Sequence, residues 1–278
     1  LGDTNSTLVV YVAKRLKIPI FHIEAGNRCF DQRVPEEVNR KVVDHLSDVN
    51  FVYSKLAKDY LIKENFNPDR VIKVGSPMKE IYNKNFSKIL KSKILEKHKL
   101  KKNKYFLISF HREEHLDNKK KLTLFIKLIN FLEENYNFNI VISTHYKLRD
   151  RLTKSKIFFK SKKIKFLKPF CYTDYCNLML NSFLVLSDSG TINEEASIMG
   201  IKAINLRETH ERPEAEEEAT VPISGLDTSL IHNQILMLNK LNKPKLVEDY
   251  NVENFSDKIV KLIGNFVNKI NEDVWKKS

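Results

Sequence analysis

Hydrophobic positions along this chain fall into short, mostly apolar runs, separated by longer stretches with apolar residues at helical spacing. The runs have the length of strands that are buried in a sheet. We predict strands at 18–23, 51–53, 71–74, 105–110, 139–143, 164–166, 183–187 and 203–206. The intervening stretches predict helices at 8–16, 35–46, 55–64, 120–135, 147–153, 173–180 and 192–199. This alternation predicts an α/β protein with parallel sheets covered by helices on both faces, the doubly wound class.

The same pattern predicts two domains. Residues 79–104 are strongly basic and contain no Gly or Pro, which indicates a helical connection between two units. We therefore expect a first Rossmann-like domain over residues 1–78 and a second over 79–250. In the final stretch, 251–278, apolar residues recur at helical spacing, so we expect a helix that packs back on the first domain.

Composition restricts the class of protein. The chain has 278 residues, of which 42% are hydrophobic and 30% charged, as in a globular enzyme rather than a disordered or collagen-like chain. The apolar run 183–186 is far shorter than the roughly 18 residues of a membrane helix, so we expect no membrane association. Three cysteines without a CxxC pair argue against a disulfide framework and against structural zinc, and we expect no metal and a cytoplasmic location.

The net charge of the chain suggests that an anionic partner should be considered. Lys and Arg exceed Asp and Glu by 48 to 35, a net charge of +13, which raises the prospect of nucleic acid, anionic lipid or a phosphorylated ligand. The excess is mostly lysine in short clusters, and aromatic residues do not alternate with these lysines as a base-stacking surface would require. A solvated lysine-rich surface is therefore the favoured interpretation, and nucleic acid is not an expected partner.

Candidate chemistry appears when the residues after each predicted strand are compared. In doubly wound sheets, ligands bind beyond the carboxyl ends of the strands. Ionisable or hydroxyl side chains follow one strand after another: Asp3; Glu24, Arg28 and Glu36; His111 and Arg112; His145; Asp188, Ser189 and Thr191; Arg207 and Arg212. A single such residue is typical of an ordinary loop, but their accumulation at one edge predicts a ligand site.

The segment 187–195, Ser-Asp-Ser-Gly-Thr-Ile-Asn-Glu-Glu, predicts a phosphate-binding turn. A strand ends there, Gly190 allows close approach to the backbone, and Ser189 or Thr191 stands at the start of a helix whose free N–H groups suit a pyrophosphate. Glu195 lies one turn further, where a carboxylate can accept hydrogen bonds from ribose hydroxyls. The segment is neither a GxGxxG fingerprint nor a Walker loop, which argues against NAD binding and ATP hydrolysis. An ordinary serine-capped helix remains the alternative.

Together these segments resemble the non-hydrolysing UDP-N-acetylglucosamine 2-epimerase family. The motifs, in order over residues 1 to about 225, are Gly-Asp-Thr at 2–4, His-Ile-Glu-Ala-Gly at 22–26, Pro-Glu-Glu-Val-Asn-Arg at 35–40, His-Arg-Glu-Glu at 111–114, Asp-Ser-Gly-Thr-Ile-Asn-Glu-Glu at 188–195 and Glu-Arg-Pro-Glu at 211–214. The variants at 26–37 and 75–78 look more like the capsule and O-antigen branch, which makes UDP-N-acetyl-L-fucosamine from its 2-epimer. The resemblance implies a GT-B-like pair of Rossmann domains with the active site in the cleft between them.

The resemblance also implies a reaction and a set of roles. The family inverts C2 of a UDP-sugar without a cofactor, by eliminating UDP to a 2-acetamidoglycal and adding it back, and its members are commonly homodimers. Three carboxylates match the acidic catalytic residues and His111 matches the catalytic histidine, which we expect near the leaving diphosphate. The matching carboxylates are Asp3, Glu24 and Glu36. The expected contacts with the UDP-sugar are Arg28, Arg112, His145, Ser189, Gly190, Thr191, Glu195, Arg207 and Arg212, with a structural role equally open for His145.

The beginning of the chain departs from this family. Leu-Gly-Asp-Thr reads as the end of a strand, and fewer than 80 residues precede the connection, whereas a Rossmann-type domain usually needs about 100–150. We therefore expect a first domain without its N-terminal strands, with an unpaired sheet edge and an exposed apolar face. Two alternatives to the epimerase stay open: a GT-B glycosyltransferase that uses a UDP-sugar, and an inactive remnant that binds nucleotide or nucleic acid.

Overall fold

The computed structural model describes residues 2–32, 34–155, 158–208 and 212–277. Its contacts divide the chain into two compact units. The first unit comprises Leu1–Asn83, Thr209–Glu217 and Val247–Ser278, and the second comprises Lys84–Glu208 and Glu218–Leu246. Neither unit is therefore a single continuous piece of chain.

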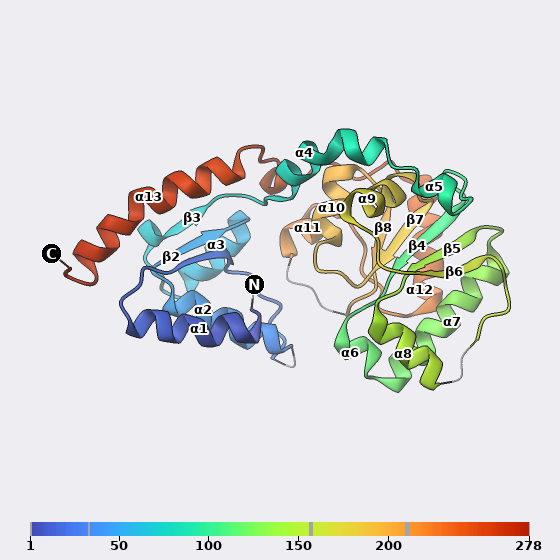
Figure 1. Cartoon of the computed structure of the whole chain (residues 1–278), viewed down its shortest axis with the longest axis horizontal. Coiled ribbons are helices and arrows are strands. Elements are labelled where there is room, and N and C mark those ends of the chain that lie inside the picture. Colours follow the sequence, from blue (N-terminus) through green and yellow to red (C-terminus); the bar gives the residue numbers. More distant parts are fainter. Residues whose placement is uncertain (1, 33, 156–157, 209–211, 278) are drawn as a thin grey trace. The chain divides into compact units, whose positions relative to one another are not determined.

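The first unit is built on a three-stranded parallel sheet in the order β1-β2-β3 (Figure 1). Its strands are β1 (Phe21–Ala25), β2 (Val49–Val52) and β3 (Val71–Lys73). The helices are α1 (Thr4–Arg15), α2 (Pro35–Leu46), α3 (Lys55–Lys63), α4 (Met78–Leu90, which runs on into the second unit), α11 (Pro213–Glu217) and α13 (Phe255–Asp273), with short 3-10 turns at Pro68–Arg70 and Glu248–Tyr250.

Helices pack on this sheet from segments that are far apart in the sequence. The apolar stripe of α13, with Phe255, Ile259 and Ile270 buried, joins Val49 and Phe51 of β2 in one cluster. A second cluster joins Ala25 and Val52 to buried residues of α3. The last helix is thus part of the core of the first unit.

The second unit contains a five-stranded parallel sheet in the order β6-β5-β4-β7-β8 (Figure 1). Its strands are β4 (Tyr105–Ser109), β5 (Asn139–Ser143), β6 (Ile164–Leu167), β7 (Leu184–Ser187) and β8 (Ala203–Asn205). The helices are α5 (Ile94–Lys97), α6 (Glu113–Leu116), α7 (Lys119–Asn135), α8 (Tyr146–Lys154), α9 (Tyr172–Asn181), α10 (Ile192–Met199) and α12 (Thr228–Lys240). The strand order reverses direction between β4 and β7, which is where doubly wound sheets form their ligand crevice.

The core of the second unit follows from the helical spacing of apolar residues on α7. Leu122, Phe125, Ile129 and Leu132 lie on one face of this helix and are buried in the main hydrophobic cluster. Phe125 stacks on Phe110, with ring centroids 4.1 Å apart. This packing holds the chain in place just beyond the end of β4.

The predicted fold class is confirmed, and two predicted segments differ. The helix expected over 79–104 breaks after α4, where Ser92 donates its hydroxyl to Asp174. It ends a second time after α5, where Lys99 and Asn103 adopt positive φ angles of 53° and 56°. α12 was not predicted, although Ile231, Ile235 and Leu238 have helical spacing and are buried.

Contacts also group residues 212–217 with the first unit, whereas the sequence placed them in the second domain. Arg212 pairs with Glu24, and Tyr250 donates its hydroxyl to Glu214 at 2.8 Å. These polar contacts hold α11 to the first unit although the chain on either side of it belongs to the second.

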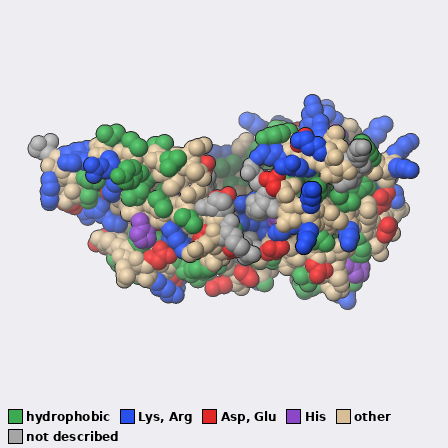
Figure 2. Space-filling model, turned by 90° about the horizontal axis from the view of Figure 1, so that it is seen from below, with side chains coloured by type: hydrophobic (Ala, Val, Ile, Leu, Met, Phe, Trp, Pro, Cys, Tyr) green, Lys and Arg blue, Asp and Glu red, His purple; other side chains and the backbone are tan. Residues whose placement is uncertain are grey.

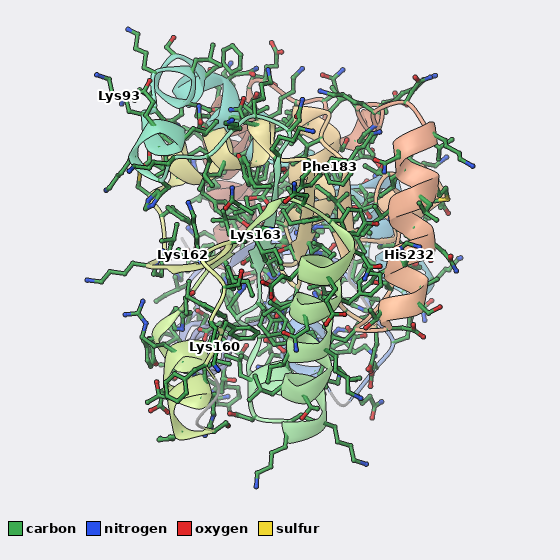
Figure 3. The ribbon with its side chains drawn as sticks, turned by 90° about the vertical axis from the view of Figure 1, so that its right-hand side faces the viewer. Lys93, Lys160, Lys162, Lys163, Phe183 and His232 are labelled. Atoms are coloured by element: carbon green, nitrogen blue, oxygen red, sulfur yellow. The ribbon has the colours of Figure 1, made fainter. Side chains whose placement is uncertain are left out.

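Lysine and arginine side chains do not form a single patch on the face of the molecule seen in Figure 2. On the face shown in Figure 2, Lys and Arg side chains are scattered over both units with hydrophobic and acidic side chains between them. Lys93, Lys160 and Lys162 are exposed and extend outward from the second unit (Figure 3). Across the described part of the chain, no helix combines the length and the hydrophobicity needed to cross a membrane.

Candidate active site

The β4 and β7 strands of the second unit lie side by side and end level with each other, with Ser109 opposite Ser187. The next residues along the chain, His111 and Asp188, therefore meet at the same edge of the sheet. Asp188 is fully buried, and its amide donates to the carbonyl of Ser109 at 3.1 Å.

The carboxylate of Asp188 is the centre of this edge. It accepts hydrogen bonds from the backbone amides of His111 and Arg112, with a nearest distance of 3.0 Å for each. The Nδ1 atoms of His111 and His115 lie 3.0 Å and 3.1 Å from its two oxygens. Burial alone would raise the pKa of Asp188, but the hydrogen bonds and charge of the histidines outweigh it and hold the pKa well below its usual range. Asp188 is therefore an anion that organises the loop after β4.

The phosphate-binding turn predicted at 188–191 begins at this carboxylate. Thr191 is the N-cap residue of α10, and its side chain makes no capping hydrogen bond. The Ser189 and Thr191 hydroxyls are 3.0 Å apart, and Gly190 lies between them. The structure thus places hydroxyl groups at a helix start, an arrangement that suits an anionic group.

Glu195 lies on α10 one turn beyond this segment and is 9% exposed. Burial, followed by the charge of Glu194, raises the pKa of Glu195 from 4.5 to about 7, while a hydrogen bond from Thr191 and the charge of His111 act in the opposite direction. Tyr175 of α9 is a partly buried neighbour, and burial, followed by the charge of Glu195, raises its pKa. Glu195 is therefore positioned to change protonation state near neutral pH.

The remaining site residues predicted in this unit lie in different environments. Arg207 is 3% exposed, and its amide and carbonyl bond to Asn205 and Gly225. Arg112 is half-buried beside Asp188. His145 is the N-cap residue of α8, and its buried Nδ1 has no hydrogen-bond partner among the described residues.

His145 also lines a cavity of about 690 Å³ together with Thr144, Arg149, Lys168 and neighbouring residues. The two cationic side chains and the helix start make this cavity suitable for an anionic or hydroxyl-rich ligand.

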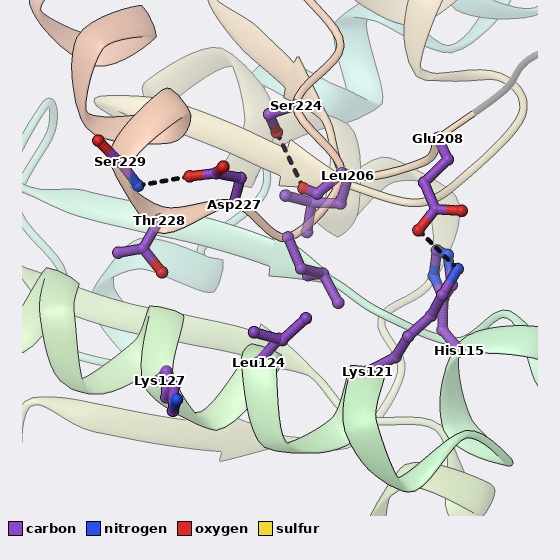
Figure 4. Close-up of a pocket in the computed structure, with 12 residues that line it drawn as sticks. His115, Lys121, Leu124, Lys127, Leu206, Glu208, Ser224, Asp227, Thr228 and Ser229 are labelled. Atoms are coloured by element: carbon purple, nitrogen blue, oxygen red, sulfur yellow. Dashed lines mark hydrogen bonds and ion pairs between the residues drawn. The ribbon is translucent and has the colours of Figure 1, made fainter.

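A second cavity, of about 530 Å³, lies between α7, the loop after β8 and the start of α12 (Figure 4). His115 reaches this cavity from the Asp188 side. Lys121 and Glu208 form an ion pair of 3.1 Å at its wall, and Asp227 accepts the amide hydrogen of Ser229 to cap α12 (Figure 4). His115, Lys121, Glu208 and Asp227 at this cavity already have partners within the protein.

In the first unit, Gly2, which precedes Asp3, lies against the start of α2, where Glu36 is found. Asp3 is exposed and caps α1 by accepting the amide hydrogen of Ser6 at 2.8 Å, and this hydrogen bond lowers the pKa of Asp3. Gly2 lies so close to α2 that an added Cβ would stand 2.8 Å from the carbonyl oxygen of Glu36, and its φ of +74° also favours glycine. The side chain of Asn39 donates to the carbonyl of Gly2 at 2.8 Å, which fixes this approach.

Glu24 occupies an irregular position in β1. The pairing with β2 shifts between Ile23 and Ala25, and Glu24 has a φ of +71°, a left-handed conformation that non-glycine residues rarely adopt. Its carboxylate pairs with Arg212, whose guanidinium also lies 5.5 Å from the ring centre of Tyr53. Backbone strain of this kind is concentrated at functional sites.

Arg28, which the sequence predicts as a contact with the UDP-sugar, lies in a buried network of ion pairs. Its side chain is fully buried, with ion pairs of 2.7 Å to both Asp44 and Glu64. Although burial itself lowers it, the hydrogen bonds and charges of Glu64 and Asp44 raise the pKa of Arg28. Asp44 also holds Nδ1 of His22 at 2.7 Å, so this network supports the loop that follows Glu24.

Sequence reasoning missed the structural importance of Asp188, Asp44 and Tyr175. Asp188 was visible as the first residue of the phosphate-binding turn, but its partner histidines are more than 70 positions away. Asp44 lies within a helix and gave no signal of its own. Within the described ranges, no group of three His, Cys, Asp or Glu side chains could hold a metal ion.

The two parallel sheets, together with hydroxyls, histidines and a buried carboxylate at the β4–β7 switch point, define a nucleotide-binding α/β enzyme of the GT-B type. Comparison with known proteins narrows this class. The family model described as UDP-N-acetylglucosamine 2-epimerase matches residues 1–264. The chain belongs to this family, and its enzymatic class is that of the isomerases.

Known structures and sequences agree with this assignment. A structure of UDP-N-acetylglucosamine 2-epimerase from Rickettsia bellii is 44% identical, with a TM-score of 0.89 over 99% of this chain and 75% of the other. The Methanocaldococcus jannaschii enzyme, solved with UDP-GlcNAc and UDP, is 32% identical, with a TM-score of 0.87 over 95% of this chain and 74% of the other. The curated M. jannaschii sequence is 35% identical over 253 residues, which are 86% of this chain and 68% of the relative.

Proposed function

We propose that this chain inverts the stereocentre at C2 of a UDP-N-acetylhexosamine by eliminating UDP and adding it back. The observation that carries the proposal is the similarity to the M. jannaschii enzyme, whose structure contains both UDP-GlcNAc and UDP. The Neisseria meningitidis epimerase bound to UDP-GlcNAc, with a TM-score of 0.83 over 95% of this chain, adds support. This membership favours the epimerase over a glycosyltransferase or an inactive remnant.

The chemistry explains why such a site needs both carboxylates and groups that bind a diphosphate. The C2 proton is not adjacent to a carbonyl and is only weakly acidic. Cleavage of the C1–O bond must therefore lead, with UDP leaving with the electron pair as positive charge develops at C1. A carboxylate then takes the C2 proton and a C1–C2 double bond forms, giving a 2-acetamidoglycal. Protonation of C2 on the opposite face and return of the UDP oxygen to C1 complete the inversion.

The residues divide into two groups by this chemistry. We assign binding of the UDP part to Ser189, Gly190, Thr191 and Glu195, with Arg112 and Arg207 as further contacts. His111 would assist the departing diphosphate. Asp3, Glu24 and Glu36 would share proton removal and return, with Arg212 keeping the Glu24 carboxylate in place. His145 would contact the nucleotide sugar through the cavity that it lines.

The proposal also includes the choice of UDP-sugar substrate. The M. jannaschii relative is named for UDP-GlcNAc, and the Pseudomonas aeruginosa relative, 31% identical over 215 residues, is named for UDP-2,3-diacetamido-2,3-dideoxy-D-glucuronate. The sequence variants around Arg28 and at 75–78 favour a 6-deoxy-L-talo substrate and a role in bacterial surface polysaccharide synthesis.

Proton NMR in D₂O tests the reaction and the substrate together. UDP-GlcNAc, the 6-deoxy-L-talo nucleotide and the diacetamido-glucuronate nucleotide are offered in separate tubes. Deuterium at C2 of one sugar, with its 2-epimer, is the expected result and identifies the substrate. Release of free sugar or transfer to an acceptor without deuterium would instead indicate a glycosyltransferase, and no reaction in any tube would contradict the proposed activity of this chain.

We also propose that the protein acts as a homodimer. Leu8, Val9, Tyr11, Val12 and Leu16 of α1 are all more than half exposed, which makes this helix the candidate contact surface. Analytical ultracentrifugation should give twice the monomer mass of 32.6 kDa, and a monomer at micromolar concentration would contradict it.

A further inference from the structure

Asp188 stands out among the buried ionisable groups because two backbone amides and two imidazole nitrogens converge on its carboxylate. Two donors are backbone amides, of His111 and Arg112. The other two are imidazole nitrogens, Nδ1 of His111 and Nδ1 of His115. An ionised carboxylate can only accept hydrogen bonds, so both imidazoles must present Nδ1–H to it.

We propose that Asp188 is the positioning residue of the active site, fixing His111 with its proton on Nδ1 so that Nε2 is the nitrogen that acts on the substrate. The proposal rests on the proposed function only for the identity of the substrate. Asp188 does not touch the sugar; it acts through the ring that it orients.

The two histidines on this carboxylate differ in a way that assigns their roles. His115 is 3% exposed and stacks on Phe110 with ring centroids 5.2 Å apart and an interplanar angle of 11°. The side chain of His111 is 43% exposed. The buried His115 therefore holds the Asp188 carboxylate in place, whereas the exposed ring of His111 is accessible to a ligand.

Asp188 also joins the loop after β7 to the loop after β4. Asp188 is the first residue of the segment that we assign to the diphosphate, and it binds the backbone of the loop after β4. The groups that bind the leaving diphosphate and the histidine that assists it are thus held by one side chain. Ser109 adds to this link, because its hydroxyl lies 3.3 Å from Nδ1 of His111.

The test is the substitution Asp188→Asn, with Asp174→Asn as the matched control. Asparagine has nearly the same shape, but its amide group would present N–H to donors that need an acceptor, and one imidazole would have to change tautomer. Asp174 is in the same unit and accepts a hydrogen bond from Ser92, away from the strand edge. Where an aspartate orients a catalytic histidine, this substitution leaves the geometry intact and lowers the rate by about 10⁴-fold.

Three measurements are made on the full chain of each variant: thermal unfolding, C2 deuterium exchange in D₂O, and the tautomeric state of His111. The last is read from ¹⁵N NMR of histidine-labelled protein, with His111→Gln used for assignment. We expect Asp188→Asn to remain folded, to lose about 10²–10⁴-fold in kcat with less than about threefold change in KM, and to lose the Nδ1–H form of His111. Asp174→Asn should match the wild type in deuterium exchange and in the tautomeric state of His111.

Two results would overturn the proposal. One is a wild-type His111 that carries its proton on Nε2, which can be read even if the variant does not fold. The other is a folded Asp188→Asn protein that exchanges at the wild-type rate. If the wild type itself exchanges no deuterium with any UDP-sugar, the proposed reaction fails, and the tautomer measurement alone still decides the role of Asp188.

Discussion

Glu195 illustrates how a single residue connects burial with pH dependence. Its carboxyl is buried on α10, with Glu194 beside it, and its pKa rises from 4.5 to about 7. Between pH 4.5 and pH 7, Glu195 is therefore mostly protonated in the folded chain and mostly ionised in the unfolded chain. The contribution of Glu195 to stability is therefore complete below pH 4.5 and is lost as the pH rises through 7, because a charge must then be buried.

We predict that Glu195→Gln removes this pH dependence. Gln does not titrate, so on going from pH 5 to pH 8 the free energy of unfolding of the wild type should fall relative to that of the variant, by about 3 kcal/mol at most. Chemical denaturation at the two pH values measures this difference. Glu134→Gln, on the exposed part of α7, is the control and should follow the wild type. Parallel pH profiles for wild type and Glu195→Gln would contradict the prediction.

A second prediction for a single residue concerns Arg28. Its ion pairs with Asp44 and Glu64 favour a role in stabilising the fold over a role in substrate binding. Arg28→Met removes the partner of two carboxylates, one of them fully buried. We expect a loss of about 3–5 kcal/mol in the free energy of unfolding, since an unpaired buried charge is left behind. Arg15→Met on the exposed face of α1 should have little effect. A stable Arg28→Met protein with a raised KM would restore the substrate-binding role that the sequence suggested.

Residue-level roles could be predicted from sequence only where they lie within one local segment. The turn at 188–191 involves neighbours a few positions apart, and the type and order of its residues predict it. The Asp3 cap was not predicted, because the sequence placed the start of the first helix at residue 8. The Asp188–His115 and Arg28–Glu64 contacts join residues 73 and 36 positions apart, so nothing local in the chain indicates them. The left-handed conformation of Glu24 was also invisible, because Glu has no preference for it.

Among the elements, α13 shows how helical periodicity produces a core contact. Its buried residues lie on one stripe, while Val260, next in sequence to Ile259, is 70% exposed. The sequence predicted this helix because its spacing is regular over its whole length. The break between α4 and α5 was not predictable, because it depends on Asp174, which lies in a helix more than 80 residues away.

We predict that Ile259→Ala lowers the free energy of unfolding by about 2–5 kcal/mol, because it leaves a cavity against the sheet of the first unit. Val260→Ala is the matched control on the same helix and should change stability by less than about 0.5 kcal/mol. Urea denaturation of both variants checks the difference. Equal effects would mean that α13 does not pack on the sheet through this face.

For the whole molecule, the division into two units predicts an uneven response to nucleotide. The residues assigned to UDP, including His111, Ser189, Thr191 and Glu195, all belong to the second unit. We expect UDP to slow amide hydrogen exchange at 109–116 and 187–196 and to leave 21–25 and 49–52 little changed. At 100 times its Kd, UDP should stabilise the binding unit by about 2.7 kcal/mol.

Hydrogen exchange read by mass spectrometry, with and without UDP, measures this response. The Asp174→Asn protein serves as a control and should show the same change in hydrogen exchange with UDP as the wild type. Protection confined to the first unit would contradict the assignment of UDP to the segment after β7.

The discontinuous make-up of the two units also has a consequence for synthesis on the ribosome. The first unit contributes the earliest residues but needs Phe255, Ile259 and Ile270 to complete its core. The second unit is complete once Leu246 has emerged. The first unit therefore completes its core only after the second unit has been synthesised. Until α13 emerges, the strands of the first unit depend on chaperones to keep them from contacts with other nascent chains.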